Sequence, residues 1–128
     1  MRLKQVSVFL ENSPGHLKRA CEALANAGIN LETITIAESN SFGVLRAIVD
    51  KSQDAVEALA KIGLAAKLVD VLAIEVEDKP GALLSILENA ENAGLNIEYM
   101  YALTKGSAGN PVMVMRFSDV DKAEKIIS

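Results

Sequence analysis

The feature that most constrains the fold of this 128-residue chain is an internal repeat. The segment from Glu11 to Glu32 recurs from Glu77 to Glu98, at an offset of 66 residues and without a gap. Ten identities in one register indicate a duplication, so we expect two similar structural units. The recurring pairs are Glu11/Glu77, Pro14/Pro80, Gly15/Gly81, Leu17/Leu83, Glu22/Glu88, Asn26/Asn92, Ala27/Ala93, Gly28/Gly94, Asn30/Asn96 and Glu32/Glu98.

Each repeat is small, which limits the core that it can form alone. A unit of about sixty residues buries only about 60 % of the surface that its unfolded chain exposes. Hydrophobic residues make up 50 % of the chain, which favours a folded core over disorder. We therefore expect two folded units that dock onto each other or onto another chain.

Charge and composition exclude several classes of partner and location. The net charge is −4 and no Lys/Arg cluster occurs, so we expect no nucleic-acid partner. The apolar stretch from Val6 to Leu10 is too short for a signal peptide or a membrane span, so we expect no membrane contact. With Cys21 as its single cysteine, the chain has no disulfide framework, and a cytoplasmic protein is the simplest interpretation.

The alternation of apolar residues and the turn signals predict a βαββαβ order in the first repeat. This is the split βαβ pattern of a ferredoxin-like unit, so the predicted fold class is α+β with two such units in tandem. The second repeat stops before a fourth strand, which leaves either a truncated sequence or a unit without that strand. We expect domains at 1–70 and 71–128, with only Asp70 between the last strand of one and the first strand of the other. The predicted strands are 5–10, 29–38, 42–49, 66–69, 71–76, 95–103 and 111–117, with helices at 14–27, 80–93, after 52 and up to 127.

The residues supply little raw material for catalysis or metal binding. The sequence contains no G-x-S-x-G, P-loop, H-E-x-x-H or C-x-x-C motif, and His16 and Cys21 are too few for a metal cluster. We therefore expect a protein that is not an enzyme, with no catalytic residues, no metal and no cofactor. His16 is interpreted either as an exposed neutral histidine or as a ligand contact.

The two Pro-Gly loops are the best candidates for a binding site. We expect Pro14 to be the first helical residue and Asn12 or Ser13 to cap the helix. A helix N-terminus carries unpaired N–H groups and about half a positive charge, and a glycine there lets a ligand approach the backbone. A small carboxylate fits such a site, and the alternative is a helix start without a ligand. The loop residues are Asn12, Ser13, Pro14, Gly15, His16 and Leu17 in the first repeat, and Asp78, Gly81, Ala82 and Leu83 in the second.

The chain resembles a tandem of ACT domains. The resemblance rests on the strand-x-Asn/Asp-x-Pro-Gly-x-Leu entry, the Ala-Gly-[Ile/Leu]-Asn exit and the βαββαβ order, and it covers nearly the whole chain. It implies an amino-acid-binding regulatory module, with ligands held between the first loop of one domain and strand 2 of a neighbour. In serine-sensing members, the loop Asn and the Asn that opens strand 2 contact the effector, which implies Asn12 and Asn30 here and Asp78 and Asn96 in the second repeat.

The match to the serine-sensing members is incomplete. The histidine that those members use two residues before the loop Asn is Leu10 here and Val76 in the second repeat, so serine does not follow from the resemblance. Asp78 would repel a ligand carboxylate to which Asn12 can donate a hydrogen bond, so we favour the first loop.

Two regulatory functions follow from the resemblance. The first is a sensor of a free amino acid, and the alternative is a non-catalytic regulatory subunit that contacts an amino-acid biosynthetic enzyme. We also expect a homodimer. In the strand order 4-1-3-2, bringing the strand 2 edges of one chain's two units together needs on the order of seven linking residues, and Asp70 alone stands there. A second chain would then supply the neighbouring strand and would also cover the edge left by the missing fourth strand.

Overall fold

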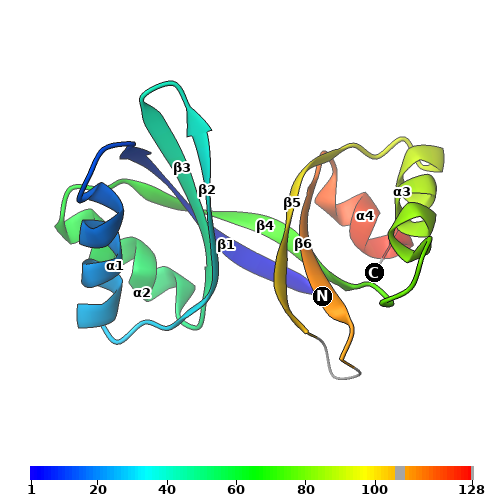
Figure 1. Cartoon of the computed structure of the whole chain (residues 1–128), viewed down its shortest axis with the longest axis horizontal. Coiled ribbons are helices and arrows are strands. Elements are labelled where there is room, and N and C mark those ends of the chain that lie inside the picture. Colours follow the sequence, from blue (N-terminus) through cyan, green and yellow to red (C-terminus); the bar gives the residue numbers. More distant parts are fainter. Residues whose placement is uncertain (106–108, 128) are drawn as a thin grey trace. The chain divides into compact units, whose positions relative to one another are not determined.

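The structure is a computed structural model that describes residues 1–105 and 109–127. The chain folds into two compact units, which are described separately (Figure 1). The N-terminal unit comprises Lys4–Val69. The C-terminal unit comprises the chain from Asp70 onward together with Met1–Leu3.

The N-terminal unit has the predicted βαββαβ order, with its two helices on one side of the sheet (Figure 1). Its strands lie in the order β2-β3-β1-β4. Val8 of β1 and Ile36 of β2 both pair with Leu45 of β3, in antiparallel register. The elements are β1 (Arg2–Glu11), α1 (His16–Asn26), β2 (Leu31–Ser39), β3 (Phe42–Val49), α2 (Ser52–Lys61) and β4 (Ala66–Glu75).

Alternating residues of the strands and one stripe of each helix form the core of the N-terminal unit. Val6, Val8 and Leu10 alternate along β1 and are buried, because successive side chains of a strand point to opposite faces. The helices add small and branched residues at helical spacing, which lets them lie close to the sheet. These helix residues are Ala20 and Leu24 of α1 and Ala55 and Leu59 of α2.

The C-terminal unit repeats the arrangement with helices α3 (Ala82–Asn92) and α4 (Val120–Ile126) and strands β5 (Ile97–Lys105) and β6 (Pro111–Phe117). Its strand order is β4-β6-β5, with β6 antiparallel to both neighbours. The Asp119 side chain caps α4 by accepting a hydrogen bond from the Lys122 N–H at 3.0 Å, as the sequence predicts. The core is Leu72, Ile74, Ala90, Leu95, Met115, Phe117 and Ala123.

The α+β ferredoxin-like tandem is confirmed, but the prediction of two strands separated by Asp70 is wrong. A single strand, β4, runs from Ala66 to Glu75 and passes through Asp70. Its first part belongs to the N-terminal unit and its second part to the C-terminal unit. The assignment of residues 1–70 and 71–128 to two family domains stays a prediction, because a compact unit and a family domain are different properties.

The expectation of an uncovered edge in the second repeat is also wrong. Among the described residues no strand follows α4, but Met1–Leu3 belong to the C-terminal unit and lie beside β4. Met1 and Ala73 exchange backbone hydrogen bonds, so the start of β1 occupies the place of a fourth strand. This cover comes from the chain itself, because the first strand extends beyond the unit that it begins.

Candidate functional site

The start of α1 differs from the prediction that Pro14 opens the helix. The helix begins at His16, and the N-cap is Gly15 with φ of 89° and no side-chain hydrogen bond to the cap. Neither Asn12 nor Ser13 caps the helix. Because the left-handed Gly15 stands between Pro14 and the helix, Pro14 lies in the turn that precedes it.

The backbone of the first loop is anchored to the turn between β2 and β3. The Asn12 N–H donates to the Ser41 carbonyl oxygen at 2.8 Å, and the His16 N–H donates to the Ser13 carbonyl oxygen at 3.4 Å. No heavy atom lies within 4 Å of the place where a Cβ of Gly15 would stand. A small ligand can therefore approach the backbone of this turn.

The electrostatics of the first loop favour an anion at the helix and place a carboxylate beside it. The first turn of α1 has no acidic residue, so the positive end of its dipole has no compensating charge within the helix. The Nε2 atom of His16 lies 3.3 Å from Oε2 of Glu11, and the His16 side chain is about one-third exposed. His16 is thus both partly accessible and near an acid, which leaves both interpretations of this residue open.

Asn30 and Asn96 are held through their backbones by equivalent contacts. The Asn30 N–H donates to Oδ1 of Asp50 at 3.0 Å, and the Asn96 N–H donates to Oγ of Ser118 at 3.1 Å. The Asn30 and Asn96 carbonyl oxygens accept from the N–H groups of Asp50 and Ser118. Within the part of the chain that the structure describes, no group hydrogen-bonds to either side-chain amide, so both amides are available to a ligand.

Within one unit, the predicted residues form two groups rather than one. Asn12 to Leu17 lie at the start of α1, and Asn30 follows its end. A helix of 11 residues is about 16 Å long, so one small ligand cannot bridge both ends. The same separation holds for Asp78 and Asn96 at the two ends of α3.

The second Pro-Gly loop lines a hollow of about 370 Å³. Of the predicted residues, Gly81 and Ala82 line it, whereas Asp78 and Leu83 do not. The Asp78 N–H instead donates to Oδ1 of Asn110 at 3.3 Å. The remaining lining residues include Glu75, Glu77, Lys79, Pro80, Ser85 and Ile86.

An exposed ion pair stands at the mouth of this hollow. Lys79 Nζ lies 2.7 Å from Oε2 of Glu77. The hydrogen bond and charge of Lys79 lower the pKa of Glu77, and Glu77 in turn raises the pKa of Lys79. Glu75 adds a second carboxylate to the lining, so this loop favours an anion less than the first loop does.

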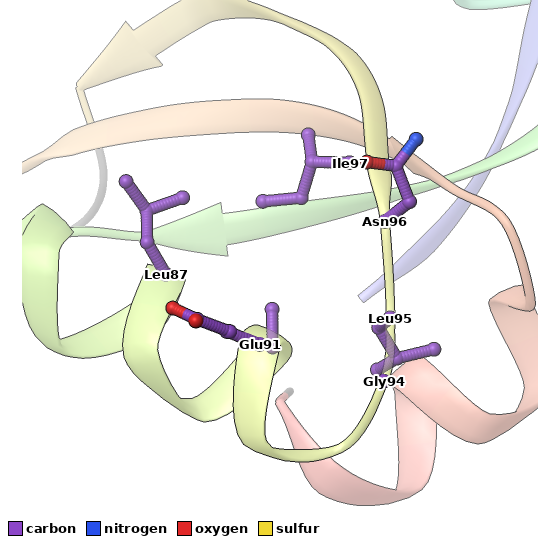
Figure 2. A pocket seen from close by; sticks show the side chains of 7 residues that line it. Leu87, Glu91, Gly94, Leu95, Asn96 and Ile97 are labelled. Carbon is purple, nitrogen blue, oxygen red and sulfur yellow. The ribbon is translucent and has the colours of Figure 1, made fainter.

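A second hollow, of about 400 Å³, lies between α3 and β5 at the other end of the helix (Figure 2). The predicted residue Asn96 lines it. The other residues labelled in Figure 2 are Leu87, Glu91, Gly94, Leu95 and Ile97.

The sequence analysis missed the residues that hold the two asparagines. Asp50 and Ser118 do the same work, but they stand 68 residues apart and therefore fall outside the register of 66. Both follow the third strand of their repeat directly, and this common position is the signal that could have found them.

Clusters for metal binding and membrane-spanning helices were also sought. In residues 1–105 and 109–127, no three His, Cys, Asp or Glu side chains gather in a way that could hold a metal ion. No helix over these same ranges is long and apolar enough to cross a membrane.

Comparisons with known proteins agree with the fold. The family model described as the ACT domain pair matches residues 1–128. A solved structure of a protein from Bacteroides thetaiotaomicron is 38% identical with a TM-score of 0.89, over 98% of this chain and 86% of that chain. A search of curated proteins returns no match.

Two further solved structures are similar in fold alone. The ligand-free regulatory subunit of aspartate kinase from Thermus thermophilus is 23% identical with a TM-score of 0.68, over 97% of this chain and 87% of that chain. The regulatory subunit of aspartate kinase from Thermus flavus is 20% identical with a TM-score of 0.61, over 99% and 91% of the two chains.

Proposed function

We propose that this chain, which belongs to the ACT domain pair family, is a regulatory protein that binds a free amino acid. The observation that carries the proposal is the start of α1. There, an uncapped helix end begins at a left-handed Gly15 with open space beside it. Such an end offers N–H donors and positive potential to a ligand carboxylate.

The proposed ligand residues of the first site are the Asn12–Leu17 loop and Asn30. The Asn12 side chain donates to the carboxylate and the Asn30 amide bonds the ammonium or the side chain of the ligand. Asp78, Gly81, Ala82, Leu83 and Asn96 form the corresponding second site, in which the carboxylates of Glu75 and Glu77 disfavour an anion. We therefore assign the ligand carboxylate to the first site.

We further propose that a homodimer completes the site. Since the loop and Asn30 lie at opposite ends of α1, one small ligand contacts both groups only if the Asn comes from a second copy. The chain then works as a non-catalytic sensor in the cytoplasm, with neither nucleic acid nor membrane as a partner.

A second candidate function is a regulatory subunit that contacts an amino-acid biosynthetic enzyme. The observation that favours it is the surface of α3, where Leu84 is 58% exposed and Leu87 is 37% exposed. The corresponding residues of α1 are Lys18 and Cys21, so the second repeat presents apolar side chains where the first does not. An exposed apolar helix face is typical of a protein-binding surface.

Calorimetric titration with each of the standard amino acids tests the proposed ligand. We expect one or a few to bind, and the Asn30→Ala variant to bind more weakly by about 1–3 kcal/mol because a polar contact is lost. The matched control is Asn89→Ala, a change at an exposed helix position outside both loops. No binding by the wild-type chain at millimolar concentrations would overturn the proposal. Light scattering tests the dimer, which a monomer with full ligand affinity would contradict.

A further inference from the structure

The hollow between α3 and β5 has aliphatic walls and one charged side chain. Figure 2 shows Leu87 and Glu91 projecting from α3 on the side of Ile97, which opens β5. Leu95 is buried beneath this region, and Ala90 completes the apolar lining. Its volume of about 400 Å³ is within the range of small-molecule sites.

The electrostatics of this hollow favour a cation. Glu91 supplies the only ionisable side chain among the lining residues, and it stands in the last turn of α3, where the helix dipole is negative. The Ala93 carbonyl oxygen at the same helix end already accepts a hydrogen bond from Nζ of Lys122. A carboxylate and a negative helix end therefore act in the same direction here.

The carboxylate is specific to the second repeat. At the offset of 66 residues, Glu91 corresponds to Ala25, and Leu87 corresponds to Cys21. The first repeat thus lacks both the charge and the large aliphatic side chain at these positions. The hollow with this chemistry is consequently a property of one repeat and not of the duplicated pattern.

We propose that this hollow binds a small aliphatic ammonium ion, with its alkyl group against Leu87 and Ile97 and its charge on Glu91. An anion of the same shape is rejected, because Glu91 and the helix end repel it. The inference goes beyond the proposed function: its walls come from a single unit, and it requires neither the Pro-Gly loops nor a second copy.

A nuclear magnetic resonance titration of the full chain tests the proposal, with isopentylammonium chloride as the probe. We expect saturable shifts of the Gly94 and Ile97 backbone amides at millimolar probe concentrations. Isovalerate carries the same alkyl group with the opposite charge, and we expect it to leave these two signals unchanged. Because the amino-acid proposal is read from calorimetry and Asn30, either proposal can fail without the other.

Two variants decide whether Glu91 holds the charge. Glu91→Gln should weaken binding of the ammonium probe about threefold, as for an exposed ion pair, and Leu87→Ala should weaken it by loss of apolar contact. Glu88→Gln is the matched control, because Glu88 is an exposed residue of α3 outside the hollow, and it should leave the affinity unchanged. Absence of saturable shifts, equal affinity for isovalerate, or full affinity in Glu91→Gln would each overturn the proposal.

Discussion

Met1 and Ala73 exchange both of their backbone hydrogen bonds. The Met1 ammonium donates to the Ala73 carbonyl oxygen at 2.9 Å, and the Ala73 N–H donates to the Met1 carbonyl oxygen at 2.7 Å. Next to this pair, the Arg2 guanidinium bonds Asp70 at 2.9 Å and Asp121 at 2.7 Å. The first residues of the chain thereby complete the sheet of the C-terminal unit.

Deletion of Met1–Leu3 is expected to destabilise the C-terminal unit. The two backbone bonds to Ala73 contribute about 1–3 kcal/mol together, and the ion pairs of Arg2 are lost as well. Urea unfolding and hydrogen exchange at Ala73 measure the effect. Arg2→Ala keeps the backbone pair and should therefore fall between wild type and the deletion. Unchanged protection of Ala73 in the deletion variant would contradict this role of the N-terminus.

Gly15→Ala is expected to lower the free energy of unfolding by about 1–2 kcal/mol, because an L-residue at φ of 89° is strained. Crowding plays no part, since the space beside Gly15 is open. Gly43→Ala is the contrasting variant: its Cβ would lie 3.2 Å from Cγ2 of Ile36, so its cost depends on how far Ile36 can move. Chemical denaturation measures both, and a Gly15→Ala protein as stable as wild type would disprove the strain.

Asp50→Ala is expected to cost about 1 kcal/mol and to weaken amino-acid binding, because the Asn30 backbone loses its acceptor. Asp50→Ser should restore part of the loss, since Ser118 performs this role in the second repeat. Thermal unfolding and calorimetry report the two effects. If Asp50→Ser behaves like Asp50→Ala, the hydroxyl does not replace the carboxylate at this site.

Lys79→Gln is expected to raise the pKa of Glu77 towards its ordinary value, because it removes the hydrogen bond and the charge that lower it. A carboxyl group with a lowered folded-state pKa stabilises above its unfolded pKa and loses that contribution as the pH falls through the folded value. Both residues are well exposed, so the effect on stability is small. A carbon-13 titration of the Glu77 carboxyl tests the shift, and Lys125→Gln is a control.

The start of each first helix shows how far local patterns carry a prediction. The Pro-Gly pair correctly marks the end of the strand and the approach of a helix. It does not reveal that Gly15 and Gly81 are left-handed, which moves both helix starts two residues past the proline. Backbone torsion at a glycine is not encoded in its neighbours' hydrophobicity, so the predicted caps at Asn12 and Ser13 are wrong.

Leu87 shows the corresponding limit for the core. Helical spacing predicts it on the buried stripe of α3 with Ala90, but it is 37% exposed and lines the hollow beside β5. Periodicity gives the face of a helix, whereas the width of the sheet beneath decides where burial ends on that face.

The sequence by itself determined the duplication, the order of elements and the residues that end the helices. These properties depend on contacts between near neighbours and on periodicity, which one repeat shares with the other. Only the tertiary structure decided that β4 is continuous through Asp70, that Met1–Leu3 pair with β4, and that Asp50 and Ser118 hold the two asparagines. These are hydrogen bonds between segments distant in the chain, and any strand offers the same backbone donors and acceptors, so local sequence does not select the partner.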